Sequence, residues 1–105
     1  MRDGSPSGDE LLAVLAALAN PQRLRILAAL GGGRNYVSQL ARDLGMGRPL
    51  LHMHLQRLEA AHLVTSSLEL SPEGKAMKYF QVEPLSLVLT MDTIAAVVPT
   101  LSVKD

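Results

Sequence analysis

The sequence predicts a mainly α-helical fold with a minor β component, namely five helices and a two-stranded β-hairpin. Three observations support this prediction. Leu and Ala, which favour helices, dominate a composition that is 48% hydrophobic but has no Trp, one Phe and two Tyr. Apolar residues recur at helical spacing over most of the chain. After Val64 they alternate with polar residues in two short runs, as in a hairpin.

The 105 residues fit one domain, which we place at residues 9–101, followed by a short tail at 102–105. Residues 1–8 are mostly Gly, Ser, Pro and charged residues, so we expect a disordered tail there. The chain has no cysteine, no signal-peptide pattern at its start and no apolar run of about eighteen residues free of charges or breakers. We therefore expect a cytoplasmic protein with no disulfide and no membrane span.

The first two helices follow one another closely. Asp9 is a suitable N-cap for the first, which carries a wide apolar stripe and is apolar on nearly every side. So small a protein has little core to bury such a helix, so we expect it to pack against a second chain. Asn20 and Pro21 begin the second helix, and three glycines end it. The residues expected to face inward on the second helix are Leu24, Leu27, Ala28 and Leu30.

Residues 37–64 predict two short amphipathic helices joined by a glycine-bearing turn, and we place this helix-turn-helix at residues 38–62. Ser38 is the expected N-cap of its first helix, and Gly45 ends that helix. Pro49 occupies an early position of the second helix, where its missing N–H costs nothing. Such a turn of about three to four residues lets a second helix enter a DNA major groove, although similar hairpins also occur as plain packing units.

The hairpin is expected at residues 64–83, with its turn at Ser71–Gly74. The rival reading is a short helix capped by Ser71, which Gly74 and the adjacent aromatic pair disfavour. Pro84 is expected to open a last helix over residues 84–98, which Pro99 ends or kinks. Between them the first and last helices hold more apolar surface than one small core needs, which predicts a symmetric dimer. The expected interface residues are Leu11, Leu12, Leu15, Leu87, Met91, Ile94 and Val98.

The formal net charge is zero, which argues weakly against a nucleic-acid partner. The charges are segregated, however. Residues 21–57 contain six arginines and one acid, Asp43, whereas the remainder holds four basic and nine acidic residues. A chain of this kind can present a positive face to a polyanion. The alternative is that the arginines are scattered, solvated positions.

Three stretches resemble motifs of one family. The run LAALANPQRLRILAAL resembles the leucine-rich helix and Pro-x-Arg helix start of the ArsR/SmtB family of bacterial transcriptional regulators. The run LARDLGMGRPLLHMHLQRLEAAHLV resembles its recognition unit, and SLELSPEGKAMKYFQV resembles its wing. The resemblance covers about Glu10 to Val82. It implies a winged helix-turn-helix that binds operator DNA as a homodimer, joined through its first and last helices, and that acts as a repressor released by an inducer.

Carried over by position, the resemblance places five residues against DNA, and a helical wheel puts the same residues on or beside the outward face of the second motif helix. Arg48 can bind guanine or a phosphate, and His52 can donate to a base edge or a phosphate or be merely solvated. Met53, beside Pro49, can touch a thymine methyl, and Gln56 fits adenine or a phosphate.

Further residues are expected to contact phosphates and set the register of binding, namely Ser38, Gln39, Arg42, Arg57 and Lys75. Lys78 is a weaker candidate, and the acids Glu69 and Glu73 would repel phosphate from the wing. His54 lies near the core edge of the wheel, where a structural role is favoured over contact with DNA.

Metal sites are the main departure from the resemblance. The family's thiolate sensors need cysteines, and its zinc-type sensors place His and acidic ligands on the last helix, where this chain has Asp92 and no His. His62 is expected to end a helix in the left-handed conformation. We therefore expect no metal and no cofactor; a metal shared between subunits through His62, Asp92 or a tail carboxylate is the alternative.

Three function classes compete. A homodimeric regulator of double-stranded DNA is preferred, with an effector or partner protein of unknown chemistry. A protein-interaction module on the same fold would suit the zero net charge, the acidic wing and the apolar Met53 and Pro49. An enzyme is not expected, because the sequence offers no Cys nucleophile, Gly-rich phosphate loop, paired carboxylates or Ser/His/Asp set.

Overall fold

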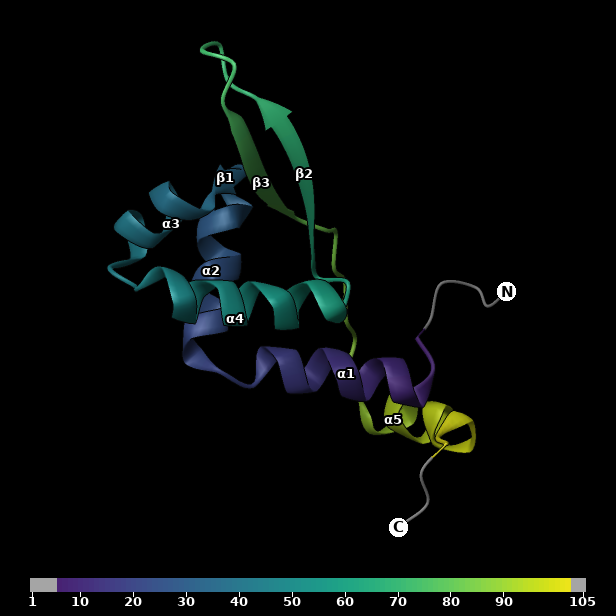
Figure 1. Ribbon diagram of the computed structural model, residues 1–105. Helices are drawn as coiled ribbons and strands as arrows, with labels where there is room; N and C mark the ends of the chain where they lie inside the picture. The colour runs from purple at the N-terminus through teal and green to yellow at the C-terminus, as the bar shows by residue number, and fades with distance from the viewer. Residues whose placement is uncertain (1–5, 103–105) are drawn as a thin grey trace.

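The computed structural model describes residues 6–102, so residues 1–5 and 103–105 of the predicted tails lie outside the described residues. The described part contains five α-helices, three strands and one 3-10 turn (Figure 1). In chain order they are α1 (Gly8–Leu18), α2 (Pro21–Gly31), β1 (Asn35–Tyr36), α3 (Val37–Leu44), α4 (Arg48–Ala60), β2 (Val64–Leu70), β3 (Ala76–Val82), α5 (Met91–Val97) and η1 (Val98–Thr100).

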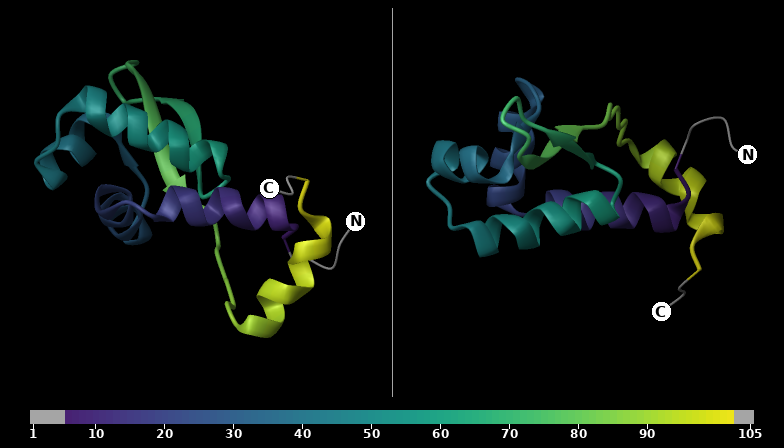
Figure 2. Two further views of the ribbon diagram at one scale, coloured as in Figure 1. Left: turned by 90° about the horizontal axis from the view of Figure 1, so that it is seen from below. Right: turned by 45° about the horizontal axis from the view of Figure 1, so that its top comes forward.

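Helices α2, α3 and α4 and the base of the sheet enclose the core, while α1 and α5 extend to one side (Figures 1 and 2). The molecule is elongated, with extents of 52 × 28 × 23 Å and a radius of gyration of 16.1 Å. A compact domain of this length has a radius of about 13 Å. The fully buried side chains all belong to the core, and they are Ile26, Leu30, Leu40, Leu51, Leu55, Leu58 and Val64.

Helix α1 begins earlier than predicted, because its N-cap is Ser7 rather than Asp9. The Ser7 hydroxyl accepts a hydrogen bond from the Glu10 N–H at 3.1 Å, and the Glu10 carboxylate accepts one from the Ser7 N–H at 2.7 Å. This reciprocal pair is a capping box. The assignment of Ser7 and Gly8 to a disordered tail was therefore wrong. Asp9 instead accepts a hydrogen bond from the Ser102 N–H at 3.1 Å, so Ser102 is tied to α1.

Helix α2 starts as predicted, because the Asn20 side chain caps it. Its buried face is rotated relative to the prediction. Ile26 and Leu30 are fully buried, whereas Leu24 and Ala28 are exposed. The run from Leu24 to Leu30 is apolar at almost every position, so the helical period alone did not fix which face turns inward.

The two helices of the motif form as expected, apart from one cap. Helix α3 starts at Val37, directly after the strand residue Tyr36, and has no side-chain cap, so the prediction of Ser38 as N-cap was wrong. Gly45 ends α3 in the left-handed conformation, with φ of 63°. Pro49 occupies the second position of α4.

Helix α4 ends at Ala60, and His62, two residues further on, turns the chain out of the helix with a positive φ of 62°. The N–H groups of His62 and Leu63 donate to the carbonyls of Glu59 at 3.0 Å and Leu58 at 2.9 Å. These bonds satisfy carbonyls that would otherwise be left unpaired at the helix end. The prediction that His62 ends this helix is confirmed.

The sheet has three strands rather than the expected two, in the order β1-β3-β2, all antiparallel. Strand β1 adds to the hairpin because Asn35 pairs with Phe80, which also pairs with Ser66 of β2. Phe80 is buried and joins the sheet to the core. The hairpin of β2 and β3, residues 64–82, is called the wing below. Its turn contains Gly74 at φ of 83°, so the rival short helix is excluded.

The C-terminal helix is shorter than predicted. Residues 83–90 form no helix, and α5 starts at Met91 rather than Pro84. The start is set by a second capping box, in which Thr90 and Thr93 each accept a hydrogen bond from the other's N–H, at 3.1 and 2.9 Å. Among the described residues no single helix is long and apolar enough to cross a membrane; α1 and α2 meet the criterion only as a pair bent by 93°.

Candidate nucleic-acid interface

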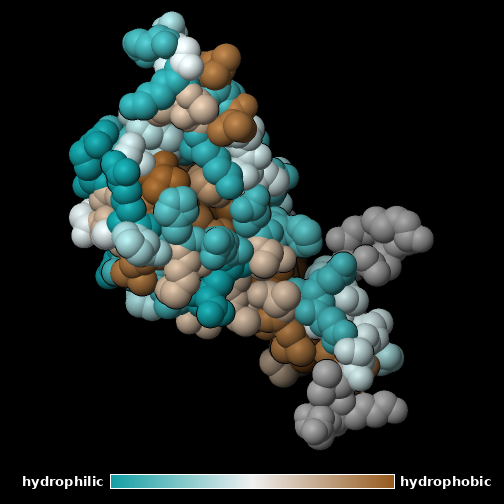
Figure 3. Space-filling model, viewed as in Figure 1, coloured by the Kyte–Doolittle hydropathy of each residue, from teal (hydrophilic) through white to brown (hydrophobic). Residues whose placement is uncertain are grey.

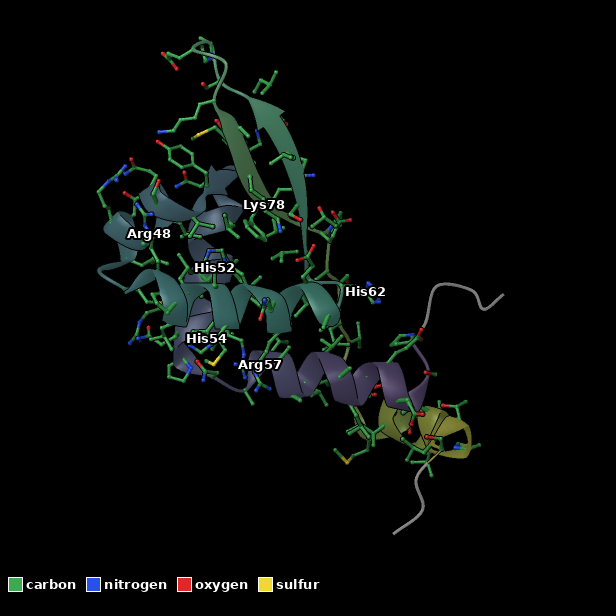
Figure 4. All side chains as sticks on the ribbon, viewed as in Figure 1. Arg48, His52, His54, Arg57, His62 and Lys78 are labelled. Atoms are coloured by element: carbon green, nitrogen blue, oxygen red, sulfur yellow. The ribbon has the colours of Figure 1, made fainter. Side chains whose placement is uncertain are left out.

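Helix α4 has two distinct faces. Leu51, Leu55 and Leu58 are fully buried against the core. The opposite face and its flanks are exposed, and Figure 4 shows Arg48 near α3, His52 on the side of α4 towards the wing and Arg57 on the side towards α1. The predicted contact residues on α4 are all exposed, namely Arg48, Pro49, His52, Met53, Gln56 and Arg57.

The polar side chains on this face have no partner within the described chain. Arg48, His52, Gln56 and Arg57 make no side-chain hydrogen bond or ion pair with another residue among 6–102. The one acid on α4, Glu59, accepts a hydrogen bond from the Ser66 hydroxyl at 3.0 Å and is half-buried. The face therefore offers free hydrogen-bond donors and positive charge, and its carboxylate is engaged elsewhere.

The predicted contact residues on α3 are arranged differently. Gln39 donates to the Asp43 carboxylate at 2.7 Å and accepts from Arg42 at 2.6 Å. Asn35 also donates to Asp43, at 3.3 Å. Ser38 is half-buried. Gln39 is thus committed to its neighbours, whereas Arg42, with five N–H donors, retains others for an outside acceptor.

On the wing Arg34 forms an ion pair with Glu69 of β2, in which Nη2 lies 2.9 Å from Oε1 and Nη1 contacts Oε2. The guanidinium also stacks over the Tyr79 ring, 4.3 Å from its centroid, and Tyr79 meets Tyr36 edge to face. Hydrogen bonding from Arg34 lowers the pKa of Glu69. This ion pair could not be predicted from the sequence, because no spacing rule relates residues 34 and 69.

Only some of the arginines that make residues 21–57 basic are therefore free at the surface. Arg34 is neutralised by Glu69, and Arg23 turns inward to bond the end of α1 and His54. Glu69 in turn is no longer the unpaired acid expected to repel phosphate. At the wing tip Lys75 and Glu73 are both exposed, and the Lys78 ammonium lies 5.5 Å from the centre of the Phe80 ring.

Apolar side chains interrupt the polar face of α4. Met53 is 40% exposed and Leu50 43% exposed, and Pro49 is exposed one turn before Met53. Figure 3 shows hydrophilic and hydrophobic side chains interspersed over this side of the molecule. His54, by contrast, is buried, so the structural role predicted for it is confirmed.

The described residues include no cluster of metal ligands. Among residues 6–102, no group of three His, Asp or Glu side chains is close enough to hold a metal ion. His62 lies at the far end of α4 from Arg48 (Figure 4).

The comparisons with known proteins agree with this geometry. A family model described as bacterial regulatory protein, arsR family, matches residues 20–66, which include both motif helices. An uncharacterized HTH-type transcriptional regulator of Methanocaldococcus jannaschii is 42% identical over 62 residues, or 59% of this chain and 63% of that protein. The HTH-type transcriptional regulator CmtR of Mycobacterium tuberculosis is 41% identical over 63 residues, or 60% of this chain and 50% of that protein. The chain thus spans less than two thirds of the length of these relatives.

Solved structures show the same fold. A possible transcriptional regulatory protein from Mycobacterium bovis, fragment 1–100, has a TM-score of 0.63 and 31% identity, over 70% of this chain and 74% of that chain. The solution structure of a homodimeric winged helix-turn-helix DNA-binding domain, from a possible ArsR-family regulator of M. bovis, has a TM-score of 0.64 and 28% identity. It covers 77% of this chain and 75% of that one.

Proposed function

This chain belongs to the ArsR family of bacterial transcriptional regulators and has a winged helix-turn-helix fold, and on that premise we propose that it binds double-stranded operator DNA as a homodimeric repressor. The family consists of regulators rather than enzymes, as the sequence predicted. We further propose that the protein acts in the cytoplasm, and that its signal is not a metal bound by the usual ligands.

The free donors of α4 are the observation that carries the DNA-binding proposal. A helix in the major groove needs side chains that are not already bonded to the protein, because base edges and phosphates must become their partners. Arg48, His52, Gln56 and Arg57 meet this condition, while most other polar residues of the motif do not. We assign base contacts to Arg48, His52, Met53 and Gln56, and phosphate contacts to Arg42, Arg57 and Lys75.

The homodimer proposal rests on apolar surface that one chain leaves uncovered. The exposed apolar residues that form this surface lie on α1 and on the segment from Leu85 to Val98. Figure 3 shows a hydrophobic area where these two parts meet. A hollow of about 270 Å³ lies between them. The extended shape also suits one half of a dimer. The proposed interface residues are Leu11, Leu12, Leu15, Leu87, Met91, Ile94 and Val98; Leu11 is largely buried within one chain and lines this hollow.

The DNA-binding proposal is tested by fluorescence anisotropy with a labelled duplex, selected from genomic fragments by the purified full chain. Arg48→Ala and His52→Ala should each weaken binding about 5- to 100-fold while the protein stays folded. Arg25→Ala is the matched control, because Arg25 is also exposed but lies on α2 and bonds Gln22 at 2.9 Å. Addition of Zn²⁺ or EDTA should leave the parent's affinity unchanged. Equal affinity of all three variants would show that α4 is not the recognition helix.

The dimer is tested by sedimentation equilibrium. Met91, which is 78% exposed, is replaced by Asp, and the apparent mass should fall from two chains to one. Leu68→Asp is the control, because Leu68 is similarly exposed, at 73%, but lies on the wing. A parent of one chain's mass at micromolar concentration, or a Met91→Asp variant that stays dimeric, would contradict the proposed interface.

A further inference from the structure

The exposed apolar pair Pro49 and Met53 stands at the centre of the outward face of α4. The two residues are four apart, so their side chains are neighbours on one side of the helix. On the helical wheel this side is opposite Leu51 and Leu55, which are fully buried. His52 and Gln56 lie beside the pair, both on the same side of it, and both side chains are free of partners within the described chain. An apolar contact point thus adjoins hydrogen-bonding groups.

Leu50 does not belong to this contact point, although it is also exposed. At about 100° per residue it lies on the flank of α4 shared with His54 and Arg57. His54 is buried, and Arg57 lines a hollow between α1 and α4. That flank faces α1, so Leu50 borders the body of the protein rather than the outward face.

We infer that α4 reads thymine through its 5-methyl group, which packs against Met53 and Pro49, and that this contact is a determinant of operator sequence. The inference rests on the proposed function and deepens it. In the major groove thymine is the only one of the four standard bases that presents a methyl group, whereas the others offer hydrogen-bond donors and acceptors alone. A thioether side chain makes no strong hydrogen bond, so its discrimination must come from apolar contact.

The properties of the two side chains suit this contact. Met is unbranched and polarizable and adapts to an irregular surface, and Pro49 is fixed within the first turn of α4. Met53 is only partly exposed, so part of its side chain already packs on the helix and less of its freedom is lost on binding. Gln56 and His52 lie next to the pair on one side of α4, where they can bond base edges beside the methyl group, so Met53, Gln56 and His52 would read one short stretch of groove.

The experiment uses the full chain and duplexes selected from a random pool. In the duplex that binds most tightly, each thymine is replaced in turn by deoxyuridine, which lacks the 5-methyl group and keeps the same hydrogen-bonding edge. We expect a loss of affinity of about three- to fivefold at one position of each half-site, from the burial of about one methyl group. In Met53→Ala the same replacement should cost clearly less affinity than in the parent, because only Pro49 remains to contact the methyl group, and that variant should bind the parent duplex more weakly.

Two further variants sharpen the result. Met53→Gln keeps a side chain of similar length but is polar, and it should also reduce the effect of deoxyuridine. Leu68→Ala removes exposed apolar surface from the wing and should keep the effect in full. The fold of each variant is checked by its thermal midpoint.

The outcomes separate the two proposals. If no duplex is enriched, the proposed function fails and the inference fails with it. If duplexes are enriched but every thymine tolerates deoxyuridine, the inference alone is overturned. It is equally overturned if the loss is as large in Met53→Ala as in the parent, because Met53 would then not contact the methyl group. A protein partner captured on this face without DNA binding would count against both.

Discussion

The side chains of Arg23 and His54 meet with Arg23 Nη1 3.2 Å from His54 Nδ1. The same guanidinium donates from Nε to the Ala17 carbonyl at 2.6 Å and from Nη2 to the Ala16 carbonyl at 3.3 Å. Arg has no acceptor, so Nδ1 of His54 must be the acceptor, which places the proton of the neutral ring on Nε2. One side chain of α2 thereby joins the end of α1 to the helix proposed to read DNA.

The burial of His54, together with this contact, makes stability depend on pH. Burial lowers the pKa of His54, and the nearby charges of Arg23 and Arg57 lower it further. The neutral ring is thus favoured in the folded state, and the unfolded chain binds more protons near the ordinary His pKa of about 6.5. The stabilisation is present above that value and is lost as the pH falls below it, towards the lower pKa of the folded state. Urea denaturation between pH 7.5 and 5 should show this loss.

A pair of variants isolates His54 in that experiment. His54→Gln keeps a neutral polar side chain that cannot be protonated, so its stability should depend less on pH than that of the parent. His52→Gln is the matched control, because it removes an exposed imidazole from the same helix. If His54→Gln follows the parent's pH profile, the contact with Arg23 does not account for the acid sensitivity.

Gly8 marks the closest approach between α1 and the C-terminal segment. Its N–H donates to the Thr100 hydroxyl at 2.6 Å, and a Cβ at this position would lie 2.5 Å from Leu101 Cδ2 and 2.8 Å from the Val97 carbonyl oxygen. We expect Gly8→Ala to lower the free energy of unfolding by about 1–3 kcal/mol, as overpacking does, despite the better helix propensity of Ala.

The control for Gly8 is Gly31, which lies at the end of α2 with no atom within 4 Å of an added Cβ. Gly31→Ala should leave stability unchanged or raise it by up to about 1 kcal/mol. Chemical denaturation measures both variants. A Gly8→Ala protein as stable as the parent would show that the C-terminal segment is not packed closely on α1.

His62 holds a backbone conformation that β-branched residues resist, with φ of 62°. His62→Val should cost about 1–2 kcal/mol of stability, and His62→Gly should be clearly better than His62→Val. At His52, inside α4, the order should reverse, because Gly is the poorer helix residue there. Urea midpoints of the four variants test this reversal; the same order at both positions would contradict the left-handed conformation of His62.

The pairing of Arg34 with Glu69 predicts an electrostatic effect on DNA binding. Glu69→Gln would release the guanidinium for a phosphate, so the slope of log affinity against log salt concentration should steepen by about one. Stability should change little, because both side chains are exposed. Glu73→Gln removes the same charge from the wing tip without releasing an arginine, so a slope that steepens equally in both variants would contradict the role of Arg34.

Much of the fold followed from local signals in the sequence. Asn20 before Pro21, Gly45 at the end of α3, and His62 at the end of α4 each lie where the backbone needs that residue type. Such requirements involve only a few neighbouring residues, so they can be read without the fold. The start of the C-terminal helix was mispredicted although its signal is also local. Leu and Val at helical spacing suggested a start at Pro84, while the actual start depends on the Thr90–Thr93 capping box.

The candidate site was likewise predictable from the sequence only in part. The outward face of α4 was predictable, because the buried positions Leu51, Leu55 and Leu58 fix its orientation. Which polar residues are free was not predictable. Arg34 and Arg23 counted towards a basic region in the sequence, yet one meets an acid of the wing and the other the end of α1.

The sequence by itself determined the mainly helical fold, the helix-turn-helix and the outward face of its second helix, because caps, glycines and apolar spacing act over a few residues. Only the tertiary structure decided that β1 joins the wing, that Ile26 rather than Leu24 enters the core, and which arginines remain free. Those outcomes depend on side chains that are distant in the chain and meet only after it has folded, and no local period or propensity specifies such meetings.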